Sequence, residues 1–356
     1  MVYLHVPFCR SFCSYCDFYS EIARRGRDAQ LFEAYTEAVC AEASRRRDEI
    51  EATRDLDTFY IGGGTPSVLP LNYLERLVGW CRPISSEFTI EVNPEDIVEK
   101  GVAYVRGLLD LGVNRISMGV QSLDDGILRW MNRRHDAARA RQAFRILREA
   151  GTDNVSVDLI FGLSQLTEDI FSRTLDEVLA WRPEHISAYQ LSIEEGSALG
   201  RLVREGRYAE ATQEQCAAQY ALLCARLRAA GYLHYEISNW ALPGREAVHN
   251  SAYWTRHPYV GLGPGAHSFD GKVRSWNGCM SSLPLREGEE VLTEKEEWEE
   301  TVMLGLRTAR GVPEELLDAE RAAPMLADGR LERAGDRLRI PEDRWFVSDG
   351  IVAELI

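Results

Sequence analysis

The chain has 356 residues and a formal net charge of −15, with 45% hydrophobic and 27% charged residues, a composition that excludes a miniprotein and a disordered chain. The acidic balance excludes nucleic acid as a partner, because the surface would repel phosphate groups and no basic stripe offsets it. No apolar run reaches the roughly 18 residues of a membrane-spanning helix, and no signal peptide opens the chain, so we expect a soluble cytoplasmic protein without a transmembrane segment.

Short apolar or β-branched runs predict parallel strands in the first half of the chain. These runs lie at 2–6, 58–61, 88–92, 115–118, 156–160 and 185–190, and helical patterns between them include 30–51, 73–80, 138–150 and 170–181. This alternation is typical of right-handed parallel crossover units. Polar or glycine-rich residues follow several strands, and the carboxyl edge of such a sheet carries the active site. Periodicity alone leaves open a doubly wound sheet and a complete or partial barrel.

Past residue 200 the strand and helix alternation fades. We expect a long helix around 214–230, then a loop-rich stretch, a helical segment from about 295 and a small hairpin over 330–340. The chain is therefore predicted to have three parts, which are a main α/β domain over 1–200, an extension of it over 201–290 and a small C-terminal domain over 291–356.

Cys9, Cys13 and Cys16 form the one tight cysteine cluster of the sequence, directly after the first predicted strand. Thiolates suit both iron-sulfur clusters and zinc. A four-iron cluster held by three cysteines keeps one iron open for a small molecule. The alternative is a zinc site of three cysteines and a histidine, either His5 or a distant one. The remaining cysteines are interpreted as isolated thiols, and they are Cys40, Cys81, Cys216, Cys224 and Cys279.

The CxxxCxxC spacing with Tyr15 resembles the radical SAM superfamily, and so does the stretch Tyr-Ile-Gly-Gly-Gly-Thr-Pro-Ser at 60–67. Glu91, at the end of the third predicted strand, matches the carboxylate that this superfamily places near its cofactor. The resemblance implies an α/β fold built as a partial (β/α)6 TIM-type barrel. It also implies a four-iron four-sulfur cluster on the three cysteines, with S-adenosylmethionine at the open iron and glycine backbone against that cofactor.

Further stretches at 115–122, 132–135, 157–163 and 235–239 are similar to the oxygen-independent coproporphyrinogen III oxidase group, so the resemblance covers nearly the whole chain. It implies that the part over 291–356 is a small helical or winged domain. The residues that it implies around the cofactor are Tyr3, Tyr15, Gly63, Gly64, Thr65, Glu91, Gln121, Arg133 and Asp158. One departure is the turn at 162–167, Gly-Leu-Ser-Gln-Leu-Thr, which lacks the proline and second glycine usual in the group.

Two features favour the HemW-type heme chaperones over the true oxidases of this group. Phe18 stands where the oxidase has a further cysteine, and the chain begins two residues before Tyr3, whereas the oxidase has an N-terminal extension. The chaperone pattern HNxxYW is intact at 249–254. It implies heme binding by His249, Asn250, Tyr253 and Trp254.

Physical chemistry supports two interpretations of the HNxxYW segment. An imidazole can ligate heme iron, and two aromatic rings can stack on a flat macrocycle. Alternatively, His249 is a hydrogen-bonded structural residue, and Tyr253 and Trp254 fill the core. His267, in the glycine-rich stretch that follows, is a second candidate for contact with the iron or a propionate.

The resemblance implies a protein that binds the cluster, S-adenosylmethionine and heme, and delivers heme to acceptors such as respiratory-chain enzymes. The alternatives are an oxygen-independent coproporphyrinogen III oxidase or another radical SAM porphyrin-modifying enzyme, and an adaptor with a zinc staple. Cleavage of the cofactor, peripheral contact with a membrane and a homodimer stay open.

Overall fold

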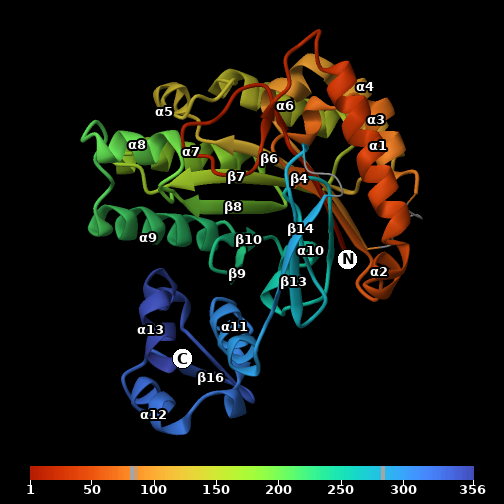
Figure 1. Cartoon of the computed structure of the whole chain (residues 1–356). Coiled ribbons are helices and arrows are strands. Elements are labelled where there is room, and N and C mark those ends of the chain that lie inside the picture. The colour runs from red at the N-terminus through yellow and green to blue at the C-terminus, as the bar shows by residue number, and fades with distance from the viewer. Residues whose placement is uncertain (81–83, 85, 282–284) are drawn as a thin grey trace.

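The computed structural model describes residues 1–80, 84, 86–281 and 285–356, and a long, mostly parallel sheet runs through its centre (Figure 1). The strands of this sheet follow the order β11-β1-β4-β5-β6-β7-β8-β10-β9. Their bounds are β1 Val2–Val6, β4 Thr58–Gly63, β5 Glu87–Val92, β6 Arg115–Gln121, β7 Val155–Phe161, β8 His185–Gln190, β9 Leu233–Glu236, β10 Asn239–Ala241 and β11 Val260–Leu262. All six strands predicted from the sequence are confirmed.

The strand order decides between the two α/β architectures that periodicity leaves open. The six parallel strands β1, β4, β5, β6, β7 and β8 lie side by side in chain order. A doubly wound sheet reverses direction at a switch point, whereas right-handed crossovers that all advance the same way place every helix on one face. The sheet is thus wound like part of a TIM-type barrel. Its order is linear, so β11 and β9 form open edges.

The crossover helices pack on one another in sequence around the outer face. Their bounds are α1 Ala29–Arg45, α2 Arg47–Ala52, α3 Leu71–Val78, α4 Pro94–Asp110, α5 Asp125–Trp130, α6 Ala137–Ala150 and α7 Glu168–Trp181. The prediction of a single helix over 30–51 is wrong in one respect. The structure has two helices there, separated at Arg46, whose φ and ψ are −101° and 20°. The Arg46 guanidinium bonds Glu42, the carbonyl of Gly261 and Ser268. Gly261 and Ser268 are far away in the chain, so local periodicity could not indicate the break.

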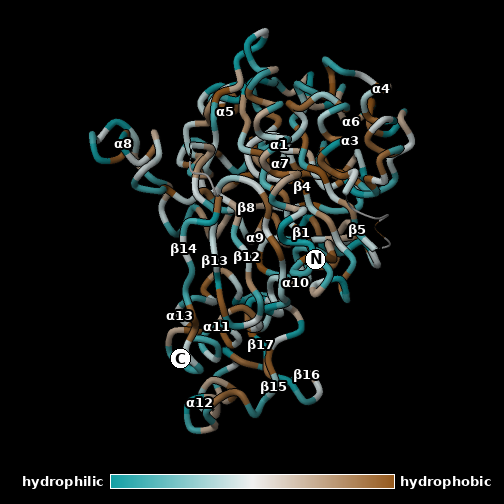
Figure 2. The backbone as a smooth tube through the Cα atoms, turned by 45° about the vertical axis from the view of Figure 1, so that its right-hand side comes forward, coloured by the Kyte–Doolittle hydropathy of each residue, from teal (hydrophilic) through white to brown (hydrophobic). Residues whose placement is uncertain are grey.

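The part over 201–290 adds strands at both edges of the main sheet. After α8 Ala198–Arg204 and the predicted long helix, α9 Gln213–Ala229, strand β10 pairs antiparallel with β8. After α10 Val248–Trp254, strand β11 pairs parallel with β1. The expected loop-rich stretch therefore contains regular structure. It also carries a three-stranded sheet of β12 His267–Phe269, β13 Val273–Asn277 and β14 Arg286–Val291, whose strands lie side by side in Figure 2.

The C-terminal segment has a hydrophobic core of its own, which includes Val302, Leu338 and Trp345. Its elements are α11 Glu294–Leu306, β15 Val312–Pro313, α12 Ala319–Ala327, β16 Glu332–Ala334, β17 Arg337–Arg339, the short 3-10 helix Glu342–Val347 and α13 Ser348–Leu355. Figure 1 shows this segment in blue below the sheet. The predicted hairpin over 330–340 is present as β16 and β17. In the described part of the chain, every helix is too short or too polar to cross a membrane.

Candidate functional site

The three cysteines lie on a loop that the rest of the molecule ties down at several points. At its base, β2 Phe8–Cys9 pairs with β3 Glu21–Ile22. In its middle, Ser14 N–H donates to the carbonyl of Met131 at 3.1 Å, and Asn132 Nδ2 donates to the carbonyl of Phe12 at 2.6 Å. The segment after α5 therefore holds the loop in place over the carboxyl edge of the sheet.

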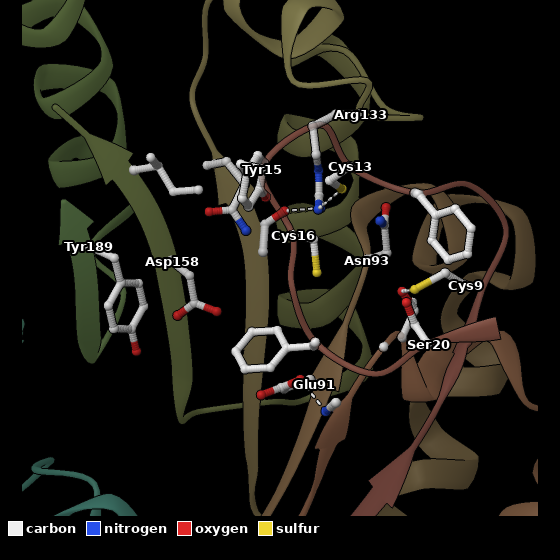
Figure 3. Close-up of a pocket in the computed structure, with 18 of the residues that line it drawn as sticks. Cys9, Cys13, Tyr15, Cys16, Ser20, Glu91, Asn93, Arg133, Asp158 and Tyr189 are labelled. Carbon is white, nitrogen blue, oxygen red and sulfur yellow. Dashed lines mark hydrogen bonds between the residues drawn. The ribbon is translucent and has the colours of Figure 1, made fainter. Parts of the chain in front are cut away.

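A cavity of about 570 Å³ opens beneath this loop and gathers most of the predicted cofactor residues (Figure 3). A small molecule with an adenosine and an amino acid part fits the usual size range of ligand pockets, roughly 300–1,000 Å³. The predicted residues that line it are Cys9, Cys13, Tyr15, Cys16, Gly63, Gly64, Thr65, Glu91, Gln121, Arg133, Asp158 and Asn250. The fold thus brings together residues that are spread over most of the sequence.

Arg133 is the cation next to the cysteines. Its guanidinium donates to Cys13 Sγ at 3.5 Å and to the carbonyl of Gly119 at 2.8 Å. Its buried Nε has no hydrogen-bond partner among the described residues. Burial raises the pKa of the Cys9 thiol to about 11, so metal must displace the proton for this sulfur to become a ligand.

Glu91 and Asp158 place two partly buried carboxyl groups on the inner face of the sheet. Tyr60 Oη and the N–H of Gly63 donate to Glu91, at 2.8 and 3.0 Å. Burial raises the pKa of Glu91 to about 7, in spite of these bonds. Ser117 Oγ lies 3.0 Å from both oxygens of Asp158, whose pKa burial also raises. The two carboxyl groups favour a ligand that carries positive charge.

Gln121 ends β6 in an unusual backbone conformation. Its φ is +64°, in the left-handed region, and the pairing of β6 with β7 shifts register between Gly119 and Gln121. Such a bulge turns a side chain that would otherwise follow the strand alternation. Non-glycine residues in this region cluster at functional sites, and Gln121 lines the cavity.

The glycines at 62–64 are required by the protein's own packing. A Cβ at Gly63, where φ is +112°, would lie 2.6 Å from the ring of His5, and one at Gly64 would lie 2.9 Å from the carbonyl oxygen of Phe8. The motif therefore fits β4 tightly against β1 and the cysteine loop. This packing explains the glycines without any ligand.

The thiols of the loop do not form a single-ion site. Among the residues that the structure describes, one set of three possible metal ligands has all its ligand atoms within 4.8 Å of one another. This set is Cys224, His234 and Glu342, and it includes none of the loop cysteines. A tetrahedral zinc with Zn–S bonds of about 2.3 Å would need its sulfur ligands to stand closer than that, whereas a cubane spreads its protein ligands over separate irons. The thiols of the loop are thus not gathered as the sulfur ligands of one zinc ion are.

Cys224 is not the isolated thiol that the sequence predicts, because it lies beside His234 and Glu342. His234 shares a hydrogen bond of 3.1 Å with Glu342, which also accepts from Arg228 at 2.8 Å. These bonds account for the cluster without an ion. Cys81 lies outside the described residues.

The HNxxYW residues point in different directions. His249 is 0% exposed, and its two ring nitrogens share hydrogen bonds with Thr58 Oγ1 at 2.9 Å and Tyr253 Oη at 3.0 Å. Asn250 lines the cysteine cavity, whereas Tyr253 and the predicted cofactor residue Tyr3 line a second cavity of about 710 Å³. Trp254 is half-buried and lines neither of these two cavities.

Several functional candidates were missed by the sequence analysis. The inner face of the sheet carries Ser117, Ser156 and Ser187 around Asp158. Tyr189, on the neighbouring strand β8, lies beside Asp158 in the wall of the cavity (Figure 3). Polar residues at alternate positions of otherwise apolar strands were the signal that could have found them. Arg115 lies under this face, 1% exposed.

Comparison with known proteins agrees with this site. The family model of the radical SAM superfamily matches residues 3–178. A protein of Mycobacterium tuberculosis (strain ATCC 25618 / H37Rv) named heme chaperone HemW is 35% identical, and the alignment covers 100% of this chain and 94% of that protein. The heme chaperone HemW of Bacillus subtilis (strain 168) is 34% identical, with 87% of this chain and 84% of that protein covered.

A solved structure has the same fold. The chain is similar to coproporphyrinogen III oxidase (HemN) from Escherichia coli, a radical SAM enzyme, with a TM-score of 0.81 over 99% of this chain and 89% of that one. The sequence identity is 20%, so this likeness concerns the fold alone.

Proposed function

We propose a function from the premise that this chain belongs to the radical SAM superfamily and, within it, to the HemW-type heme chaperones. It binds a four-iron four-sulfur cluster and S-adenosylmethionine, carries heme, and delivers the heme to acceptor proteins such as respiratory-chain enzymes. The observation that carries this proposal is that one cavity gathers three cysteines and two partly buried carboxyl groups in a chain that aligns along its whole length with a protein named a heme chaperone.

The residues of the cavity have separate roles in this proposal. Cys9, Cys13 and Cys16 hold the cluster, and the guanidinium of Arg133 compensates the charge of the thiolates. Glu91 and Asp158 attract the ammonium and sulfonium charges of S-adenosylmethionine, because burial weakens the competing interaction with water. When bound, the cluster supplies single electrons, the chemistry that this superfamily uses.

Phe18 favours the chaperone over an oxidase. It stands two positions after Cys16 and is 71% exposed beside the cavity, in the place where the oxidase group has a further cysteine. A phenyl ring cannot ligate a metal, but it offers an apolar face to a flat macrocycle. The cytoplasmic location, the homodimer and the three-part division of the chain stay predictions.

Anaerobic reconstitution of the full-length protein tests this proposal. We expect about four irons and four sulfides per chain, binding of one heme, and transfer of that heme to a heme-free acceptor. The Cys9→Ala, Cys13→Ala, Cys16→Ala variant should lose the iron. A colourless protein with one zinc, or a cluster with four protein ligands, would overturn the cluster assignment.

A second incubation separates the chaperone from the enzyme. The reconstituted protein is supplied with coproporphyrinogen III, S-adenosylmethionine and a reductant. We expect no loss of carbon dioxide from the propionates. Stoichiometric decarboxylation would replace the chaperone function with that of the oxidase.

A further inference from the structure

The second cavity lies next to the cysteine cavity and is built from four separate segments. Strand β1 contributes Tyr3, the end of the cysteine loop contributes Phe18, helix α10 contributes Tyr253, and the three-stranded sheet contributes His267. Asp17 and Phe18 line both cavities. The two cavities therefore share a wall made of the cysteine loop.

Aromatic rings form much of the surface of this second cavity. Tyr253 packs edge-on against Tyr259, with ring centroids 4.8 Å apart, and both rings line the cavity together with Tyr19. A side chain at Gly265 would lie 3.0 Å from Tyr19 Cβ, so the glycine lets this tyrosine approach. A volume of about 710 Å³ bounded by aromatic rings suits a large, flat, mostly apolar ligand.

His267 differs from the other histidines of the chain in its access to a ligand. All seven histidines lie in the described residues, and His267 is the one whose side chain is exposed. Neither of its ring nitrogens has a hydrogen-bond partner among the described residues. By contrast, both nitrogens of His249 are bonded, and so are those of His5, to Tyr3 Oη at 3.0 Å and the carbonyl of Tyr19 at 2.9 Å.

We propose that heme binds in this second cavity with the imidazole of His267 as an axial ligand of its iron. This inference rests on the proposed function, because it takes heme as the cargo. His249 then acts as a positioning residue, since its bond to Tyr253 fixes one aromatic wall. His267 is exposed, so a heme bound to it is accessible to the acceptor protein that must receive the heme.

The charges around this cavity orient the heme. Asp17 and Glu287 line it, and carboxylates repel the two propionates of heme. The propionates therefore point away from these two residues. Because Phe18 lies between the two cavities, the macrocycle edge comes next to the loop that holds the cluster.

Heme titration of the reconstituted full-length protein tests this inference. The wild type, His267→Ala and Cys279→Ser are compared, since Cys279 offers the other soft ligand in the cavity. We expect His267→Ala to weaken heme binding about tenfold or more, which corresponds to a loss of about 1.4 kcal/mol of binding free energy. The variant should also lose the absorption and electron paramagnetic resonance signature of histidine ligation. Added imidazole should restore that signature, and Cys279→Ser should match the wild type.

The outcomes separate this inference from the function on which it rests. If the wild type binds no heme, the proposed function fails. If the wild type binds heme and His267→Ala has the same affinity and spectrum, His267 is not a ligand of the heme iron. This inference alone is then overturned. A loss of the signature in Cys279→Ser also overturns it. Iron content equal to that of the wild type shows that each variant keeps its fold and cluster.

Discussion

Glu91 titrates close to neutral pH in the folded chain. Burial raises its pKa to about 7, whereas the carboxyl group of an unfolded chain has a pKa of about 4.3. Between these values the folded protein keeps a proton that the unfolded chain releases, so stability falls as pH rises through this window and levels off above pH 7.

Replacing Glu91 with glutamine should remove this pH dependence. Between pH 5.5 and 7.5, the cluster-free wild type should lose about 2 kcal/mol of unfolding free energy more than Glu91→Gln, given about 1.4 kcal/mol per pKa unit. Urea unfolding at the two pH values measures the difference. Parallel pH profiles of the two proteins would show that the carboxyl group has an ordinary pKa.

Gln121 allows a test of backbone strain at the cavity. Because its φ is +64°, a β-branched residue there should cost about 1–3 kcal/mol. We expect Gln121→Val to lower the unfolding free energy by that amount, whereas Gln121→Gly, which accepts this φ freely, should stay close to the wild type. Equal unfolding midpoints for the two variants would contradict the assigned strain.

Single residues also show where sequence reasoning reached its limit. The cysteines, Glu91 and Asp158 were predicted because their motifs are local. The direction of a side chain is set in part by partners far away in the chain, such as Thr58, which shares a hydrogen bond with His249. Tyr3 was predicted near the cofactor, yet it lines the second cavity and not the cysteine cavity.

The turn at 162–167 lacks the proline and second glycine usual in the group, and side chains of helix α9 stabilise it instead. Gln219 of α9 accepts from the N–H of Gly162 and donates to the carbonyl of Leu166, both at 2.7 Å. Gln215 donates to the carbonyl of Ser164 at 3.1 Å. Thr167 then caps the N-terminus of α7. Side chains of a helix thus hold a turn that lacks the usual proline and second glycine.

Removing Gln219 should destabilise this turn. In Gln219→Leu the buried N–H of Gly162 loses its partner, which costs about 1–3 kcal/mol. The carbonyl of Leu166 keeps the longer bond from Gln215 at 3.4 Å. Gln213→Leu, at an exposed position of the same helix, is the matched control. Hydrogen exchange of residues 162–167 and urea unfolding measure the effect. Equal exchange in both variants would mean that the turn is stable without Gln219.

Element prediction succeeded for strands long enough to show a pattern, such as β1 with five residues and β7 with seven, in which apolar side chains alternate with more polar ones. It failed for the strands of the part over 201–290, since β10 and β11 are three residues long and too short for any periodicity. Their positions depend on pairing with β8 and β1, which are far away in the chain. Sequence spacing therefore gave the parallel core of the sheet but not its two edges.

Buried apolar side chains form two hydrophobic cores in the part of the chain that the structure describes. The short 3-10 helix Glu342–Val347 contacts both. Trp345 is buried in the core of the C-terminal segment, 2% exposed. The next residue, Phe346, packs on the core of the main sheet, with its ring 5.5 Å from that of Tyr220. His234 lies beside Trp345, with ring centroids 4.3 Å apart. This helix therefore helps to dock the C-terminal segment on the sheet, together with the backbone hydrogen bonds of Ile237 to Arg307 and of Ala309 to Tyr235.

Phe346→Ala should loosen the docking without unfolding either core. Loss of a partly buried aromatic ring costs less than the roughly 3–5 kcal/mol of a fully buried one, so we expect a loss of about 1–2 kcal/mol. Hydrogen exchange in residues 302–355 should become faster, while exchange in β1 to β8 stays slow. Val347→Ala, at a neighbouring position that is 53% exposed, is the matched control. Faster exchange throughout the chain would mean instead that the two cores unfold as one cooperative unit.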